Sequence, residues 1–180
     1  MVTGRGSVAA DRLVTVAYEA GHYVGGRIRN VVAFYWLKPG SVAGVEALVQ
    51  LCEQVSAGRT RPLSAIHVVR PDIGLPDAAV RQALGVAMKK YANVTSCLAV
   101  VTPGAGFWVS ALQSAITGIR MLAPVGGSML RFVAKPADLR GWFVDEHVAR
   151  TGESLDDTCV IEAISELMAL GDERSAGHKP

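Results

Sequence analysis

Apolar positions along the chain follow two different spacings. In three early segments, Leu13–Glu19, His22–Ile28 and Val31–Leu37, valine and aromatic residues are dense, and glycine or asparagine separates the segments. That composition is typical of β-strands joined by tight turns. Over residues 42–55 the apolar residues instead recur at intervals of three and four, which predicts a helix with Ser41 as its N-cap. The chain therefore begins with an antiparallel ribbon and then changes to helical spacing.

Beyond residue 56, segments with strand and helix patterns alternate. The expected strands are Leu63–Val69, Ser96–Thr102 and Met129–Ala134. The expected helices run from Pro76-Asp77 to Tyr91, over residues 107–122, from Pro136 to about Ala149, and from Ser154, with Asp157 completing a capping box, to about Leu170. Strict alternation favours parallel strands with right-handed crossovers. The predicted fold class is α/β, with a small mixed sheet of four to six strands and an added C-terminal helix.

The whole chain of 180 residues is expected to be one domain. Its core would span about residues 12–150, followed by the C-terminal helix at about 154–170 and a loose tail at 171–180. Half of the residues are hydrophobic and 19% are charged, which excludes a disordered chain. A net charge of +2 gives no reason to expect nucleic acid as a partner.

The three cysteines, Cys52, Cys97 and Cys159, lie far apart in apolar stretches, which predicts buried free thiols in a reducing compartment. The N-terminus has no apolar signal core, so a cytoplasmic location is expected. Residues 91–119 carry no charge, but Pro103 and nearby glycines interrupt them. A buried strand followed by a buried helix explains this stretch better than a membrane span.

Residues 102–108, TPGAGFW, form a glycine-rich turn between a strand and a helix, where many α/β proteins hold phosphate. No lysine follows the glycines, as a P-loop requires, and Val109 stands where a dinucleotide fingerprint needs a third glycine. We therefore expect a tight turn whose glycines serve backbone geometry. Phe107 and Trp108 are expected to anchor the start of the helix.

No catalytic, metal-binding or cofactor-binding residue is assigned from the sequence. There is no Gly-x-Ser-x-Gly elbow, no His-x-x-x-His pair and no Cys/His ligand spacing. His67 lies within a strand and is interpreted as a half-buried side chain. The loop Arg70–Asp77 follows the carboxyl end of a strand, where open α/β sheets place binding sites, but its prolines fit the start of a helix equally well.

The helix at 107–122 carries an apolar stripe for the sheet and an opposite face without charge. A solvated helix face usually carries Lys and Glu, so partial cover by another chain, a ligand or the C-terminal helix is expected. The candidate interaction surface comprises Asp72, Phe107, Ser110, Gln113, Ser114 and Thr117. In the following helix, Trp142 and Phe143 diverge by about 100°, and Trp142 is the residue expected to pack inward.

Four stretches carry a resemblance to a known family: NVVAFYW, LPDAAVRQALGVAM, AVVTPGAGFWVSALQSAITGI and LRFVAKPADLRGWF. Together with the order of elements over about residues 22–148, they resemble the STAS-like (SpoIIAA-like) domains of anti-sigma-factor antagonists, in an uncharacterised bacterial branch. Regulatory members carry a phosphorylated serine or threonine where this chain reads RPDIGLPDAAV, which has no hydroxyl. In its place Asp72 offers a fixed charge.

The resemblance implies a non-enzymatic protein-interaction or regulatory module that associates with a protein partner or with itself as a homodimer. The alternative is a protein that binds an apolar ligand, such as a lipid, in a Sec14-like manner, because that fold group is related in topology. An enzyme of unrecognised class stays open as a third hypothesis. No cofactor is expected under the first two.

Overall fold

The computed structural model describes residues 14–19, 21–58, 60–71, 73–104, 106–122 and 129–176. They form one six-stranded sheet in which the strands lie side by side in chain order, β1 to β6. The strands are β1 (Val14–Glu19), β2 (Tyr23–Ile28), β3 (Val31–Trp36), β4 (Leu63–Val69), β5 (Thr95–Val101) and β6 (Met129–Val133). β1, β2 and β3 pair antiparallel, and β3 to β6 pair parallel. The predicted antiparallel ribbon and parallel repeats are confirmed.

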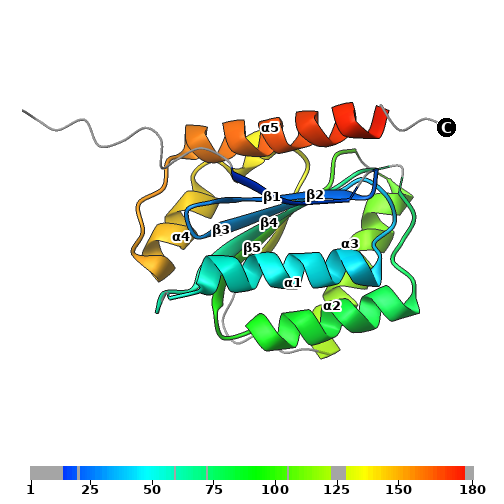
Figure 1. The fold of residues 1–180 in the computed structure, drawn as a ribbon, viewed down its shortest axis with the longest axis horizontal. Helices are drawn as coiled ribbons and strands as arrows, with labels where there is room; N and C mark the ends of the chain where they lie inside the picture. The colour runs from blue at the N-terminus through cyan, green and yellow to red at the C-terminus, as the bar shows by residue number, and fades with distance from the viewer. Residues whose placement is uncertain are drawn as a thin grey trace, which may run out of the picture.

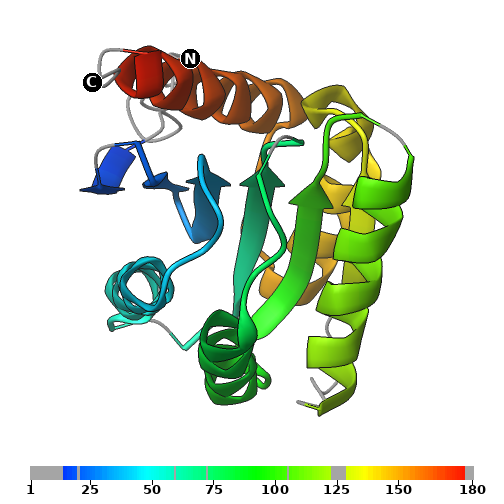
Figure 2. The same ribbon diagram turned by 90° about the vertical axis from the view of Figure 1, so that its right-hand side faces the viewer.

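Helices cover both faces of the sheet. They are α1 (Val42–Ser56), α2 (Ala78–Tyr91), α3 (Phe107–Leu122), the short 3-10 helix η2 (Pro136–Leu139), α4 (Trp142–Thr151) and α5 (Asp157–Ala176). Because parallel neighbours follow one another in chain order, right-handed crossovers put α1, α2 and α3 on the same face. The other face is then left for η2, α4 and α5, and Figure 1 and Figure 2 show α5 across the sheet from α1 and α2.

Alternate residues of each strand supply two separate cores. In β3, Phe34 and Trp36 pack against α1, whereas Ala33 and Tyr35 pack against α5. All six residues of β3 are buried, as expected for a strand covered on both faces.

The starts of α1 and α2 agree with the sequence prediction. The Ser41 hydroxyl accepts a hydrogen bond from the backbone N–H of Gly44 at 3.0 Å, and the Asp77 carboxylate accepts one from Val80 at 2.9 Å. Each side chain satisfies a backbone donor that the first helical turn leaves without a partner.

The single helix predicted from Pro136 to about Ala149 is wrong. Gly141 adopts a φ of 75° and divides the segment into η2 and α4. Its backbone N–H donates to both carboxylate oxygens of Asp157, at 3.0 and 3.1 Å. Asp157 is therefore engaged with Gly141, and it is Asp156 that accepts from the N–H of Cys159 at the start of α5.

The C-terminal helix is longer than predicted, and it packs on the face of the sheet opposite α3. α5 begins at Asp157 and continues to Ala176, so residues 171–176 are helical and not a loose tail. Its buried residues, among them Ile164 and Leu167, pack on the face opposite α3. Of the three covers considered for the uncharged face of α3, the C-terminal helix is therefore excluded, because α3 and α5 lie on different sides of the sheet. None of the described helices is both long enough and apolar enough to span a membrane.

Candidate functional site

A cavity lies between α2 and the sheet, because α2 stands off the strands. α2 packs mainly against its neighbours α1 and α3, and of the α2 residues that line the cavity Ala87 is small, whereas Leu84 and Met88 are large. The loop before it is held to the start of α3: the Trp108 indole N–H donates to the carbonyl of Ile73 at 2.5 Å. The Tyr91 hydroxyl then ties the other end of α2 to the carbonyl of Val49 in α1 at 3.2 Å.

The cavity has a volume of about 160 Å³ and an almost entirely apolar lining. Strands β3 to β6 form its floor, and α1, α2 and α3 form its walls. The apolar residues that line it are Trp36, Leu48, Val49, Leu63, Ala65, Val69, Ile73, Val80, Leu84, Ala87, Met88, Leu98, Val100, Leu112, Ile116, Ile119 and Leu130. A concave apolar site with few polar groups is the usual form of a small-molecule site.

Besides Thr95 at the start of β5, the polar side chain on the strand floor of this cavity is that of His67. The indole N–H of Trp36 donates to its Nδ1 at 3.2 Å, and the two rings are nearly parallel, with 10° between their planes. The side chain is half-buried, and its surroundings are apolar cavity wall. Burial there lowers the pKa of His67 to about 4, so the imidazole is neutral at physiological pH.

The other titratable groups of the lining contribute little charge. Burial raises the pKa of the Cys52 thiol to about 12, which keeps it protonated and inert as a nucleophile. Burial also raises the pKa of Tyr91. Arg120, in the last turn of α3, is the charged residue of the lining, and it lies toward the end of the cavity where β5 begins. The interior near His67 is therefore uncharged.

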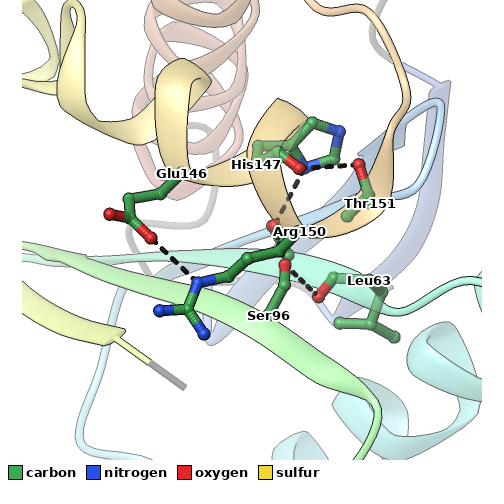
Figure 3. Close-up of polar contacts among 7 residues, drawn as sticks. Leu63, Ser96, Glu146, His147, Arg150 and Thr151 are labelled. Atoms are coloured by element: carbon green, nitrogen blue, oxygen red, sulfur yellow. Dashed lines mark hydrogen bonds and ion pairs between the residues drawn. The ribbon is translucent and has the colours of Figure 1, made fainter. Parts of the chain in front are cut away.

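A second polar cluster is buried on the opposite face of the sheet, beneath α4 (Figure 3). The Ser96 hydroxyl donates to the carbonyl of Leu63 at 3.0 Å and lies 2.6 Å from the Ser64 hydroxyl, which lies 2.9 Å from Nδ1 of His147. A register shift between β4 and β5, in which Leu63 and Ser64 pair with Thr95 and Cys97, brings Ser96 to this side.

This second cluster is structural. Its three side chains are at most 4% exposed, and Nε2 of His147 is buried with no hydrogen-bond partner among the described residues. Burial lowers the pKa of His147, so this imidazole too is neutral. The cluster serves to seat α4 on the sheet.

The residues of the predicted interaction surface lie outside the cavity. Phe107 is 89% exposed, and Ser110, Ser114 and Thr117 are exposed on α3, while Gln113 is half-buried. The Ser114 hydroxyl bonds back to the carbonyl of Ser110 at 2.9 Å. Asp72 lies outside the described residues. The structure thus places five of the six residues on one helix, α3.

Two expectations about aromatic side chains are wrong. Trp108 anchors the start of α3 through Ile73, but Phe107 points to solvent. In α4, Phe143 is fully buried, whereas Trp142 is half-buried, with its indole N–H donating to the carbonyl of Asp138 at 2.8 Å.

Among the cysteines, Cys52 and Cys97 are buried as predicted and Cys159 is half-buried.

The glycine-rich turn before α3 needs glycine for its backbone. Gly104 and Gly106 both adopt a φ of 101°, a region that residues with a side chain rarely occupy. The predicted geometric role of these glycines is confirmed.

Sequence reasoning missed the cavity, and with it Trp36 and His67. The available indication was Ala87, a small side chain among the positions of α2 that line the cavity. A histidine flanked by Ala65 and Val69 on the same face of a strand was the second indication.

In the described ranges, no three histidine, cysteine or acidic side chains gather as a metal site. No family model matches the chain, and comparisons with curated proteins and with solved structures give no match either.

Proposed function

We propose that this protein binds a small apolar molecule in the cavity between α2 and the sheet. The observation that carries the proposal is the cavity itself, about 160 Å³ with an apolar lining and one neutral histidine on its floor. The cavity is partly open to solvent, so its apolar lining meets water, which is unfavourable. A ligand that fills the cavity would cover these apolar side chains and make van der Waals contacts with them.

The volume sets the size of the ligand. An engineered apolar cavity of about 150 Å³ in another protein accommodates benzene. A single ring or a short branched chain therefore fits here, whereas a two-chain lipid exceeds the space. For so few atoms, we expect a Kd of about 0.1–1 mM for a simple hydrocarbon ring.

Titration of the protein with fluorobenzene, followed by ¹⁹F NMR, tests the proposal. The wild-type protein should bind fluorobenzene saturably. Ala87→Leu, which extends a side chain from α2 into the cavity, should weaken binding by roughly tenfold or more. Ala79→Leu makes the same change on the exposed side of α2 and serves as the matched control, with unchanged binding. Equal binding by all three proteins, or none by the wild type, would overturn the proposal.

A second candidate function is the STAS-like interaction module, which we propose as self-association through α2 and α3. It is supported by the exposure of large apolar side chains beside a shallow groove between these helices: Val86 is 65% and Met121 is 79% exposed. Sedimentation velocity over a concentration series tests it. Concentration-dependent dimers that Val86→Lys abolishes would support this role, and a wild-type monomer at all concentrations would contradict it.

A further inference from the structure

The hydrogen bond from Trp36 determines which nitrogen of His67 carries the proton. An indole N–H can only donate, so Nδ1 of His67, 3.2 Å away, must be the acceptor. In a neutral imidazole, the proton then resides on Nε2. Trp36 therefore holds His67 as the tautomer whose Nε2–H is a hydrogen-bond donor.

This donor has no acceptor among the described residues. The hydrogen bonds of the described chain include one to Nδ1 of His67 and none from its Nε2. Nδ1 is directed to Trp36 on the neighbouring strand β3, so Nε2 lies on the side of the ring away from β3. Since His67 lines the cavity, this N–H is available to whatever occupies the cavity. Nε2 of His67 is not among the buried atoms that lack a partner, so it is open to the cavity, where water or an acceptor on the ligand would satisfy it.

Charge argues against an anionic ligand at this end of the cavity. His67 is neutral, and of the other titratable groups in the lining, Cys52 is a protonated thiol and Tyr91 a neutral phenol. Arg120 lies toward the opposite end, because α3 runs back along the sheet from the carboxyl end of β5 to the amino end of β6. A carboxylate at His67 would be desolvated without a cation beside it, which is strongly unfavourable.

We infer that the ligand is an uncharged molecule about the size of one ring that carries a hydrogen-bond acceptor, such as a carbonyl oxygen, which accepts from Nε2–H of His67. This inference rests on the proposed function and names the ligand class of the same cavity. His67 selects the ligand and the apolar walls supply most of the affinity.

Three probes of similar shape test the inference by displacing fluorobenzene: acetophenone, α-methylstyrene and benzoate. The first carries C=O, the second replaces the oxygen with CH₂, and the third replaces the methyl group with a charged oxygen. In the wild type, acetophenone should bind roughly three- to tenfold more tightly than α-methylstyrene, the range expected for one hydrogen bond. Benzoate should bind most weakly.

Two variants connect the preference to His67. His67→Phe keeps an aromatic ring and removes the donor, so it should bind acetophenone and α-methylstyrene about equally. His67→Gln places an amide N–H close to the position of Nε2, so it should restore part of the ketone preference. Melting curves establish that both variants are folded.

The outcomes of these titrations distinguish the inference about His67 from the proposed function, which is the binding of an apolar molecule in the cavity. A ketone preference that persists in His67→Phe, or tightest binding by benzoate, overturns the inference while cavity binding stands. If fluorobenzene and all three probes fail to bind the wild type, the proposed function fails and the inference fails with it.

Discussion

The indole N–H of Trp36 donates to Nδ1 of His67 across neighbouring parallel strands, at 3.2 Å and with the ring planes 10° apart. The contact follows from register, because Trp36 pairs with Val69 and the side chains of Trp36 and His67 emerge on the same face of the sheet. It holds a neutral imidazole in the floor of an apolar cavity. A histidine that is held neutral in this way should affect the pH dependence of stability as well as ligand binding.

The protein should lose stability as the pH falls from about 6.5 toward 4. Burial lowers the pKa of His67 to about 4, whereas the unfolded chain has a value near 6.5. Between these values the unfolded state binds a proton that the folded state does not, so acid favours unfolding. The full effect is about 3 kcal/mol from this residue.

Urea denaturation of the wild type and of His67→Gln at several pH values measures this effect. The variant keeps the carboxylates and His147, so the difference between the two curves isolates His67. The wild type should lose more stability than His67→Gln over this pH range. Parallel curves would show that His67 is not held neutral by the fold.

His67 and His147 should adopt opposite tautomers. The direction of each hydrogen bond at His147 follows from the Leu63 carbonyl, which can only accept. The Ser96 hydroxyl therefore donates to that carbonyl. Because the one proton of the Ser96 hydroxyl is then used, the Ser64 hydroxyl donates to Ser96. The Ser64 oxygen is then the acceptor for Nδ1–H of His147.

Long-range ¹H–¹⁵N correlation spectra at neutral pH distinguish the two forms. We expect the proton on Nε2 in His67 and on Nδ1 in His147. The same tautomer at both sites would contradict one of the two hydrogen-bond assignments. Ser64→Ala offers a control, because it should change the ¹⁵N shifts of His147 and leave those of His67 unchanged.

The sequence predicted the strands and most helices because their periodicities are local. It could not predict which face each helix covers, because that depends on strand order. Because the strands lie in chain order, α1, α2 and α3 must share one face of the sheet. The residue pattern of a single segment does not contain the strand order. For this reason the sequence left open whether the C-terminal helix or another molecule covers the uncharged face of α3.

The candidate site was missed for a related reason. A cavity is set by how far α2 stands from the sheet, and that distance depends on anchors remote in sequence, such as the bond from Trp108 to Ile73. The predicted residues on α3, Ser110 and Ser114 among them, follow a local pattern of missing charge. His67 and Trp36 come together only through the pairing of β3 with β4.

Phe143 should contribute far more to stability than its neighbour Trp142. Phe143 is fully buried and its ring lies parallel to His147, with centroids 6.4 Å apart. Phe143→Ala should cost about 3–5 kcal/mol, as for other large buried aromatic side chains. Trp142 rests at the edge of the core with the guanidinium of Arg131 4.9 Å from its ring, so Trp142→Ala should cost less than about 2 kcal/mol. Chemical denaturation measures both, and the reverse order would contradict this placement of α4.

Gly171 is a helix glycine at which alanine should be harmful despite its better helix propensity. A Cβ at this position would lie 2.7 Å from Cδ1 of Tyr35 and 3.2 Å from Leu37. The Tyr35 ring cannot retreat easily, because it is buried and its hydroxyl donates to the Asp172 carboxylate at 2.9 Å. We expect Gly171→Ala to lose about 1–3 kcal/mol of stability through overpacking, which outweighs the propensity gain of about 1 kcal/mol.

Gly118→Ala on α3, where a Cβ would meet nothing within 4 Å, is the matched control and should gain up to about 1 kcal/mol. Thermal melting should move the two variants in opposite directions, and a stabilised Gly171→Ala would mean that α5 does not approach β3 this closely.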